Sequence, residues 1–153
     1  MRPIPRIAGG LVALAMLVTG CTITQHVQPV PPNTLSSLCI QENDETWSKE
    51  FLPTLRAQLE RRGIASTVYQ GTPPESCRYR LTYDVNWGWD LAVYLTYANL
   101  RIYDGMKPIG EATYDARDGG GRFDKFGRTE EKLNTLLDQL LQGNPGTAVP
   151  SPS

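Results

Sequence analysis

The chain has 153 residues, 40% of them apolar, and a formal net charge of −1, which suits one small globular domain with extensions. With 15 basic and 16 acidic residues it lacks the excess of positive charge that is typical of nucleic acid binding, so we expect no nucleic acid partner. It also shows no metal-ligand cluster and no cofactor motif, and we expect neither a metal nor a cofactor.

The first twenty residues have the three-part layout of an export signal. Arg2 and Arg6 are followed by an uncharged run, residues 7–18, which is too short to be a good membrane span. Val18-Thr19-Gly20-Cys21 then resembles a bacterial lipobox, in which the Cys thiol receives diacylglycerol and the new amino group is acylated, for example with palmitate. Cleavage after residues 1–20 would leave 133 residues with a net charge near −3. The alternative is an ordinary secretory signal with a chance cysteine.

A lipidated Cys21 would hold the protein on a membrane, because two or three acyl chains form a lasting anchor. By resemblance to Gram-negative lipoproteins, Thr22 rather than Asp after that cysteine favours the outer membrane, facing the periplasm. Thiols pair in that oxidising compartment, so we predict a disulfide between Cys39 and Cys77. A redox or nucleophilic cysteine is the alternative, but the sequence has no CxxC motif to support it.

Residues 21–34 contain three prolines among polar neighbours and are expected to form an extended tether, with His26 in solvent. The globular domain is then expected over residues 35–142, beginning with a short strand at 35–40. From about Thr46, apolar residues recur every four positions and predict an amphipathic helix. Pro53 conflicts with this helix, which either kinks there or begins close to it.

The following segments alternate or repeat in ways typical of strands and one more helix. We expect a strand at 64–70 parallel to the first, a strand at 79–87 ending in a turn around Gly88, a fourth strand to 102 and a fifth at 108–116. In the fourth, the apolar parity changes at Ala98-Asn99, which predicts a β-bulge or a strong bend. Thr129 is expected to cap a last helix, and residues 143–153 to form a disordered tail.

This order of elements, βαββββα, predicts an α+β two-layer sandwich. About five mostly antiparallel strands would form the sheet, and two helices would cover one of its faces.

Three groups of residues are candidates for function. At the expected hairpin tip, Trp87, Trp89 and Asp90 form a binding patch in one interpretation and close the core in the other. The parity of Trp87 matches the buried side of its strand, so we predict that Trp87 is structural and Trp89 partly exposed. A second group, the meander carboxylates Asp84, Asp90 and Asp104, could supply an acid/base pair, although acidic residues are common at strand ends.

The third group follows three glycines and precedes the last helix. Arg122, Lys125, Arg128 and Thr129 could bind an anion together with backbone amides at the helix N-terminus. The glycine spacing does not match a Walker motif, and a solvated loop is the simpler interpretation.

Three segments resemble the Sbal-type family of uncharacterised proteobacterial lipoproteins: residues 87–95, residues 110–114 and, most distinctively, Lys125-Phe126-Gly127-Arg128-Thr129-Glu130-Glu131-Lys132. The resemblance covers roughly residues 38–141. It implies an envelope lipoprotein and transfers no catalytic residue.

Taken together, these features favour a non-enzymatic envelope lipoprotein whose domain binds another envelope component, with an envelope protein as the expected partner. Two alternatives stay open: an envelope hydrolase that uses the meander carboxylates, and a carrier of a small ligand or anion.

Overall fold

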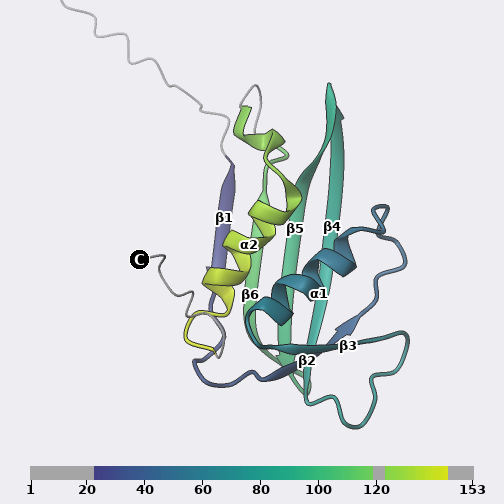
Figure 1. Ribbon diagram of the computed structural model, residues 1–153, viewed down its shortest axis with the longest axis vertical. Coiled ribbons are helices and arrows are strands. Elements are labelled where there is room, and N and C mark those ends of the chain that lie inside the picture. Colours follow the sequence, from purple (N-terminus) through teal and green to yellow (C-terminus); the bar gives the residue numbers. More distant parts are fainter. Residues whose placement is uncertain (1–22, 119–122, 145–153) are drawn as a thin grey trace, which may run out of the picture.

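The structure, a computed structural model, describes residues 23–118 and 123–144, and one mixed sheet with two α-helices forms the domain (Figure 1). The strand order is β1-β6-β5-β4-β2-β3. The strands are β1 (Thr24–Gln28), β2 (Ser37–Gln41), β3 (Ala65–Tyr69), β4 (Tyr79–Asp90), β5 (Ala92–Asp104) and β6 (Lys107–Asp115). The helices are α1 (Phe51–Arg61), the 3-10 helix η1 (Phe123–Phe126) and α2 (Thr129–Leu140).

Both α-helices lie on the same face of the sheet, so the α+β class with two helices is confirmed (Figure 1). Strands β4, β5, β6 and β1 pair antiparallel, whereas β2 is parallel to both β3 and β4. The sheet has six strands, one more than expected, because β1 precedes the predicted domain.

The prediction of a tether over residues 21–34 is wrong for the part that the structure describes. Strand β1 pairs with β6 from Thr24 opposite Asp115 to Gln28 opposite Glu111. Val30 is fully buried, and its backbone N–H donates to the carbonyl of Leu140 at 2.8 Å. The prolines therefore lie in the connection between two strands instead of separating the domain from the membrane. His26 lies on β1 with its side chain exposed.

The domain also extends beyond its predicted end at residue 142. Asn144 is buried, and its Oδ1 accepts hydrogen bonds from the backbone N–H groups of Thr34 and Leu35, each at 2.9 Å. The backbone of Gly143 accepts a further bond from Asn33 at 2.9 Å. The predicted signal peptide, the predicted lipidation site Cys21 and the predicted tail over residues 145–153 lie outside the described residues.

Helix α1 begins at Phe51, later than predicted, and this resolves the conflict over Pro53. In the first turn of a helix the backbone N–H has no intrahelical acceptor, so a proline there removes no hydrogen bond. Helix α2 starts one residue earlier than a Thr129 cap would place it: Arg128 occupies the N-cap and Thr129 is the first helical residue.

Buried Arg62, directly after α1, joins the two helices. Its guanidinium donates to Gln58 of α1, to the carbonyl and side chain of Asn134, and to Asp138 of α2. The core lies between the helices and the sheet and contains the apolar residues of β4, β5 and β6 that share one face.

The predicted disulfide between Cys39 and Cys77 is confirmed, with a Cα–Cα distance of 5.8 Å. It links β2 to the segment that leads into β4. Within residues 23–118 and 123–144, no helix has the length and apolar character needed to span a membrane.

Candidate functional site

The β4–β5 hairpin continues past α1 and α2, and its outer end is the candidate site (Figure 1). Its strands pair from Tyr79 opposite Asp104 to Asp90 opposite Ala92, and Leu91 forms the turn with a φ of 63°. The predicted turn around Gly88 is therefore wrong, because Gly88 lies within β4. A Cβ at this position would lie 2.6 Å from the Thr96 methyl and 3.4 Å from the Tyr94 ring, so close packing requires the glycine.

The predicted bulge exists but lies nearer the tip. Asn86 is opposite Tyr97, while Trp87 is opposite Leu95, so Thr96 is the additional residue on β5. The bulge changes the parity of β5, as the apolar pattern indicated, and keeps Leu95 on the buried side with Ala98.

Trp87 forms the base of the tip. Its ring packs edge-on against Phe51 at the start of α1, with centroids 6.0 Å apart, and against Trp47 at 6.2 Å. Trp87 is half-buried, which agrees with its predicted structural role. Trp47 precedes α1 instead of lying in its apolar stripe, and it is 71% exposed.

Beyond Trp87, neither α1 nor α2 covers the side of the hairpin that carries Trp89. Trp89 is 75% exposed, in agreement with the prediction, and Val93 lies directly opposite it on β5, also exposed. A hollow of about 420 Å³ lies here, lined by the indoles and by Val85 and Val93. We call Trp47, Trp87, Trp89, Leu91 and Val93 the aromatic tip.

An ion pair holds η1 against the hairpin. Lys125 donates from Nζ to Asp90 at 2.7 Å, and this hydrogen bond raises the pKa of Lys125. The same ammonium lies over the rings of Tyr94 and Phe126, which pack edge-on with centroids 5.2 Å apart. Asp90 thus positions η1 instead of facing a ligand with the two indoles. Lys132 of α2 reinforces this junction by donating to the carbonyls of Leu95 and Lys125.

This arrangement does not favour the predicted anion site. Lys125 is buried against Asp90, and Arg128 lies 4.0 Å from Glu130. Glu130 and Glu131 place negative charge in the first turn of α2, where an anion would otherwise be attracted by the helix dipole. Arg122 and the three glycines lie outside the described residues. Lys125, Arg128 and Thr129 therefore form no common cradle.

The meander carboxylates do not converge either. Asp104 pairs with Arg78 at 3.1 Å at one end of the hairpin, and Asp90 lies at the other end. Asp84 lies between them, 3.5 Å from Arg101. The hydrogen bond from Arg78 lowers the pKa of Asp104, so this group remains ionised and is a poor general acid.

The sheet face opposite the helices carries a polar network. Glu111 accepts hydrogen bonds from Asn99 at 2.8 Å and from Arg101 at 3.0 Å, and these contacts lower its pKa. Asn99 also donates to Thr113. The side chains bind one another across the strands, which is the pattern of a structural ladder, although the buried Oδ1 of Asn99 has no hydrogen-bond partner among the described residues.

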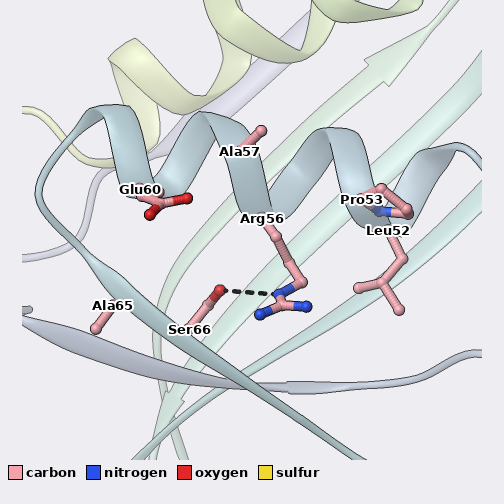
Figure 2. A pocket seen from close by; sticks show the side chains of 7 residues that line it. All are labelled: Leu52, Pro53, Arg56, Ala57, Glu60, Ala65 and Ser66. Atoms are coloured by element: carbon pink, nitrogen blue, oxygen red, sulfur yellow. Dashed lines mark hydrogen bonds between the residues drawn. The ribbon is translucent and has the colours of Figure 1, made fainter.

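A second hollow, of about 560 Å³, lies between α1 and the edge strand β3 (Figure 2). Arg56 points from α1 toward β3 and donates to the hydroxyl of Ser66 at 3.4 Å, while Glu60 lines the same space (Figure 2). A serine nucleophile needs an adjacent base. His26 is on β1 at the opposite edge of the sheet, so this hollow has no histidine to activate Ser66.

Sequence reasoning found Trp87 and Trp89 but missed the other members of the aromatic tip. Trp47 fitted the helical repeat, and Leu91 and Val93 fitted the buried alternation of a strand. The lengths of the elements could have shown that these residues are exposed. Strands β4 and β5 have 12 and 13 residues, whereas α1 has 11 residues and a smaller rise per residue, so the helix is too short to cover the end of the hairpin.

No protein-family model and no curated protein matches the sequence. Among solved structures, the chain is similar to a point variant of PelC from Paraburkholderia phytofirmans, described as a dodecamer, with 13% identity and a TM-score of 0.50 over 76% of this chain and 92% of that chain. Another PelC dodecamer structure from the same organism aligns with 13% identity and a TM-score of 0.47, again over 76% of this chain and 92% of the other. At this identity, the first similarity shows a shared fold alone.

Proposed function

We propose that the protein is an envelope lipoprotein, anchored through acylated Cys21, whose non-enzymatic domain binds another envelope component. The observation that carries the proposal is the aromatic tip, because Trp89 and its neighbours form an apolar surface that the domain itself leaves open. Contiguous exposed apolar surface marks an interaction site. The resemblance of residues 18–21 to a lipobox supports a position of this site at a membrane, and Thr22 supports the periplasmic side of the outer membrane.

A binding role agrees better with the described residues than catalysis does. The three meander carboxylates are distributed along the hairpin, and each is paired with a basic residue. Tryptophan offers a large apolar contact area together with one N–H donor, which suits recognition more than bond breaking.

Replacing Cys21 with serine tests the anchor. The thiol is the acyl acceptor, so Cys21→Ser should abolish palmitate labelling and the normal cleavage of the signal peptide. Unchanged labelling in this variant would refute the anchor.

Site-specific photocrosslinking in intact membranes tests the binding surface. A photoreactive residue in place of Trp89 should capture a discrete envelope component, while the same residue in place of Met106, which is 93% exposed at the opposite end of the hairpin, should not. Equal capture at both positions would refute the assignment of the binding surface to the tip.

Further copies of the same chain are a second candidate partner. The shared fold with PelC, which is described as a dodecamer, and the presence of two edge strands, β1 and β3, support this candidate. Light scattering of the acylated protein in detergent tests it: a monomeric mass at every concentration would exclude self-assembly.

A further inference from the structure

The start of β1 and the aromatic tip lie at the same end of the sheet (Figure 1). One row of paired residues crosses four strands there: Thr24 opposite Asp115, Asp115 opposite Tyr97, and Tyr97 opposite Asn86. Strand β1 runs from this row away from the tip, so the chain enters the domain from the tip side.

The distances along the chain show how close the anchor and the aromatic tip could come to the same surface. Cys21 precedes Thr24 by three residues, and three residues span about 11 Å at most. From Asn86 the hairpin continues for four more residues of β4, about 13 Å at the usual rise of a strand. An acyl anchor on Cys21 would therefore be within about 11 Å of Thr24, a reach similar to the distance by which the hairpin extends beyond the row.

The exposed apolar side chains are concentrated at this end. Within the described residues, six large apolar side chains are exposed. They are Trp47, Trp89, Leu91, Val93, Phe123 and Met106. The first four belong to the aromatic tip, and Phe123 lies on η1, which Lys125 ties to the hairpin. Met106, at the β5–β6 turn, is the exception at the far end.

We propose that the aromatic tip inserts into the interfacial layer of the same lipid bilayer that holds the acylated Cys21. The domain would then contact the membrane at two points, the acyl chains and the hairpin, and would have one fixed orientation. This inference rests on the proposed lipoprotein function and names the bilayer as the component that the tip binds.

The chemistry of the tip suits this occupant. Tryptophan is enriched at membrane interfaces, where its ring lies among the acyl chains and its N–H reaches the polar layer. Leu91 at the turn of the hairpin would extend deepest, and Val93 and Trp89 would follow on its two strands. A protein partner is the competing occupant of the tip. Binding of a protein partner would not explain why the tip lies at the end of the sheet where the chain enters from Cys21, whereas insertion into the bilayer does.

The three tryptophans of the chain are all in the aromatic tip, so intrinsic fluorescence reports on it directly. The experiment uses the acylated protein in vesicles of phosphatidylethanolamine and phosphatidylglycerol that contain phosphatidylcholine brominated on its upper acyl carbons. We expect a blue-shifted emission that the brominated lipid quenches, and Trp89→Phe should remove much of the quenched signal.

A double variant supplies the matched control. Trp89→Phe with Met106→Trp moves one indole from the tip to the β5–β6 turn at the other end of the sheet. Both positions are exposed, so neither change should remove core packing. Trp47 and Trp87 remain in this variant, so the emission of the moved indole is obtained by subtracting the spectrum of Trp89→Phe; it should be that of an indole in water and should escape quenching. Equal quenching of the moved indole, or no quenching of the unaltered protein, would overturn the insertion.

Flotation of the same vesicles distinguishes failure of the tip insertion from failure of the proposed lipid anchor. If the protein carries acyl chains and floats but Trp89 is not quenched, the insertion is wrong and the anchored binding domain survives. If Cys21 carries no acyl chain and the protein does not float, both are wrong. Capture of a polypeptide instead of lipid by a photoreactive residue at position 89 also overturns the insertion, in favour of a protein partner.

Discussion

Replacing Trp87 with alanine should destabilise the domain by about 2 to 3 kcal/mol, whereas the same change at Trp89 should cost less than about 0.5 kcal/mol. Fully buried large aromatics cost about 3 to 5 kcal/mol on truncation to alanine, and Trp87 is only half-buried. Its two ring contacts, with Phe51 and Trp47, account for about 0.5 to 1.5 kcal/mol each. Trp89 is 75% exposed and has little packing to lose.

Urea denaturation followed by circular dichroism measures both changes without relying on the fluorescence of the residues replaced. With a slope of about 1.5 kcal/mol per molar urea, Trp87→Ala should lower the midpoint by about 1.5 M, and Trp89→Ala should leave it nearly unchanged. Trp87→Phe is the matched control, because it keeps an aromatic ring against Phe51 and should lose less.

Equal and large losses for Trp87→Ala and Trp89→Ala would show that both indoles belong to the core. The apolar surface of the aromatic tip would then be part of the core, and the observation that supports the binding proposal would no longer hold. An unchanged midpoint for Trp87→Ala would refute the structural role of this residue instead.

Three further predictions concern the frame that supports the tip. Asn144→Leu should lower the free energy of unfolding by about 2 to 4 kcal/mol, because it leaves the backbone N–H groups of Thr34 and Leu35 without an acceptor. Asn144→Asp keeps the acceptor oxygen, so urea denaturation should show a smaller loss for this control. Cys39→Ala with Cys77→Ala should cost about 4 kcal/mol in the loop-closure model, and reduction of the native protein should lower its melting temperature in the same way. The pKa of Glu111 is lowered in the folded state, so its contribution to stability is complete above about pH 5 and is lost as the pH falls through the folded value; Glu111→Gln should flatten this acid limb in a pH series of melting curves.

The elements that could be predicted from the sequence are those with a regular alternation of buried apolar and exposed polar side chains. The alternation in β4 and the leucine stripe of α2 led to the right strand and helix, because each element buries one of its faces in the core. The disulfide followed from two cysteines and an oxidising compartment, and needed no knowledge of distance.

Strand β1 was missed for a physical reason. An edge strand with one pairing partner needs few buried side chains, and in β1 only Val27 packs partly against the core. Its stabilisation comes from backbone pairing with β6, which leaves little trace in composition. The prolines after it then read as a tether, although they only turn the chain toward β2.

The position of the hairpin turn was missed because its geometry breaks a usual preference. Leu91 has a positive φ, a conformation that glycine adopts more easily, while Gly88 lies in an extended strand. Space decided the placement of the glycine. The ring of Tyr94 and the methyl of Thr96 occupy the volume that a side chain at position 88 would need, so the glycine marks a close contact and not a turn.

The composition of the tip cannot be explained by folding alone. Apolar side chains in a strand normally stabilise the fold by covering the core. Leu91 at the turn and its neighbours Trp89 and Val93 are exposed instead, so truncating them should leave the stability of the domain unchanged. A polar hairpin end would serve the fold equally well and would lower the risk of aggregation. The exposed surface therefore supports the proposed contact outside the domain, and the pairing of β1 limits where an anchored domain could make that contact. Because the chain enters β1 within three residues of Cys21, an anchored domain could not move its tip far from the lipid surface.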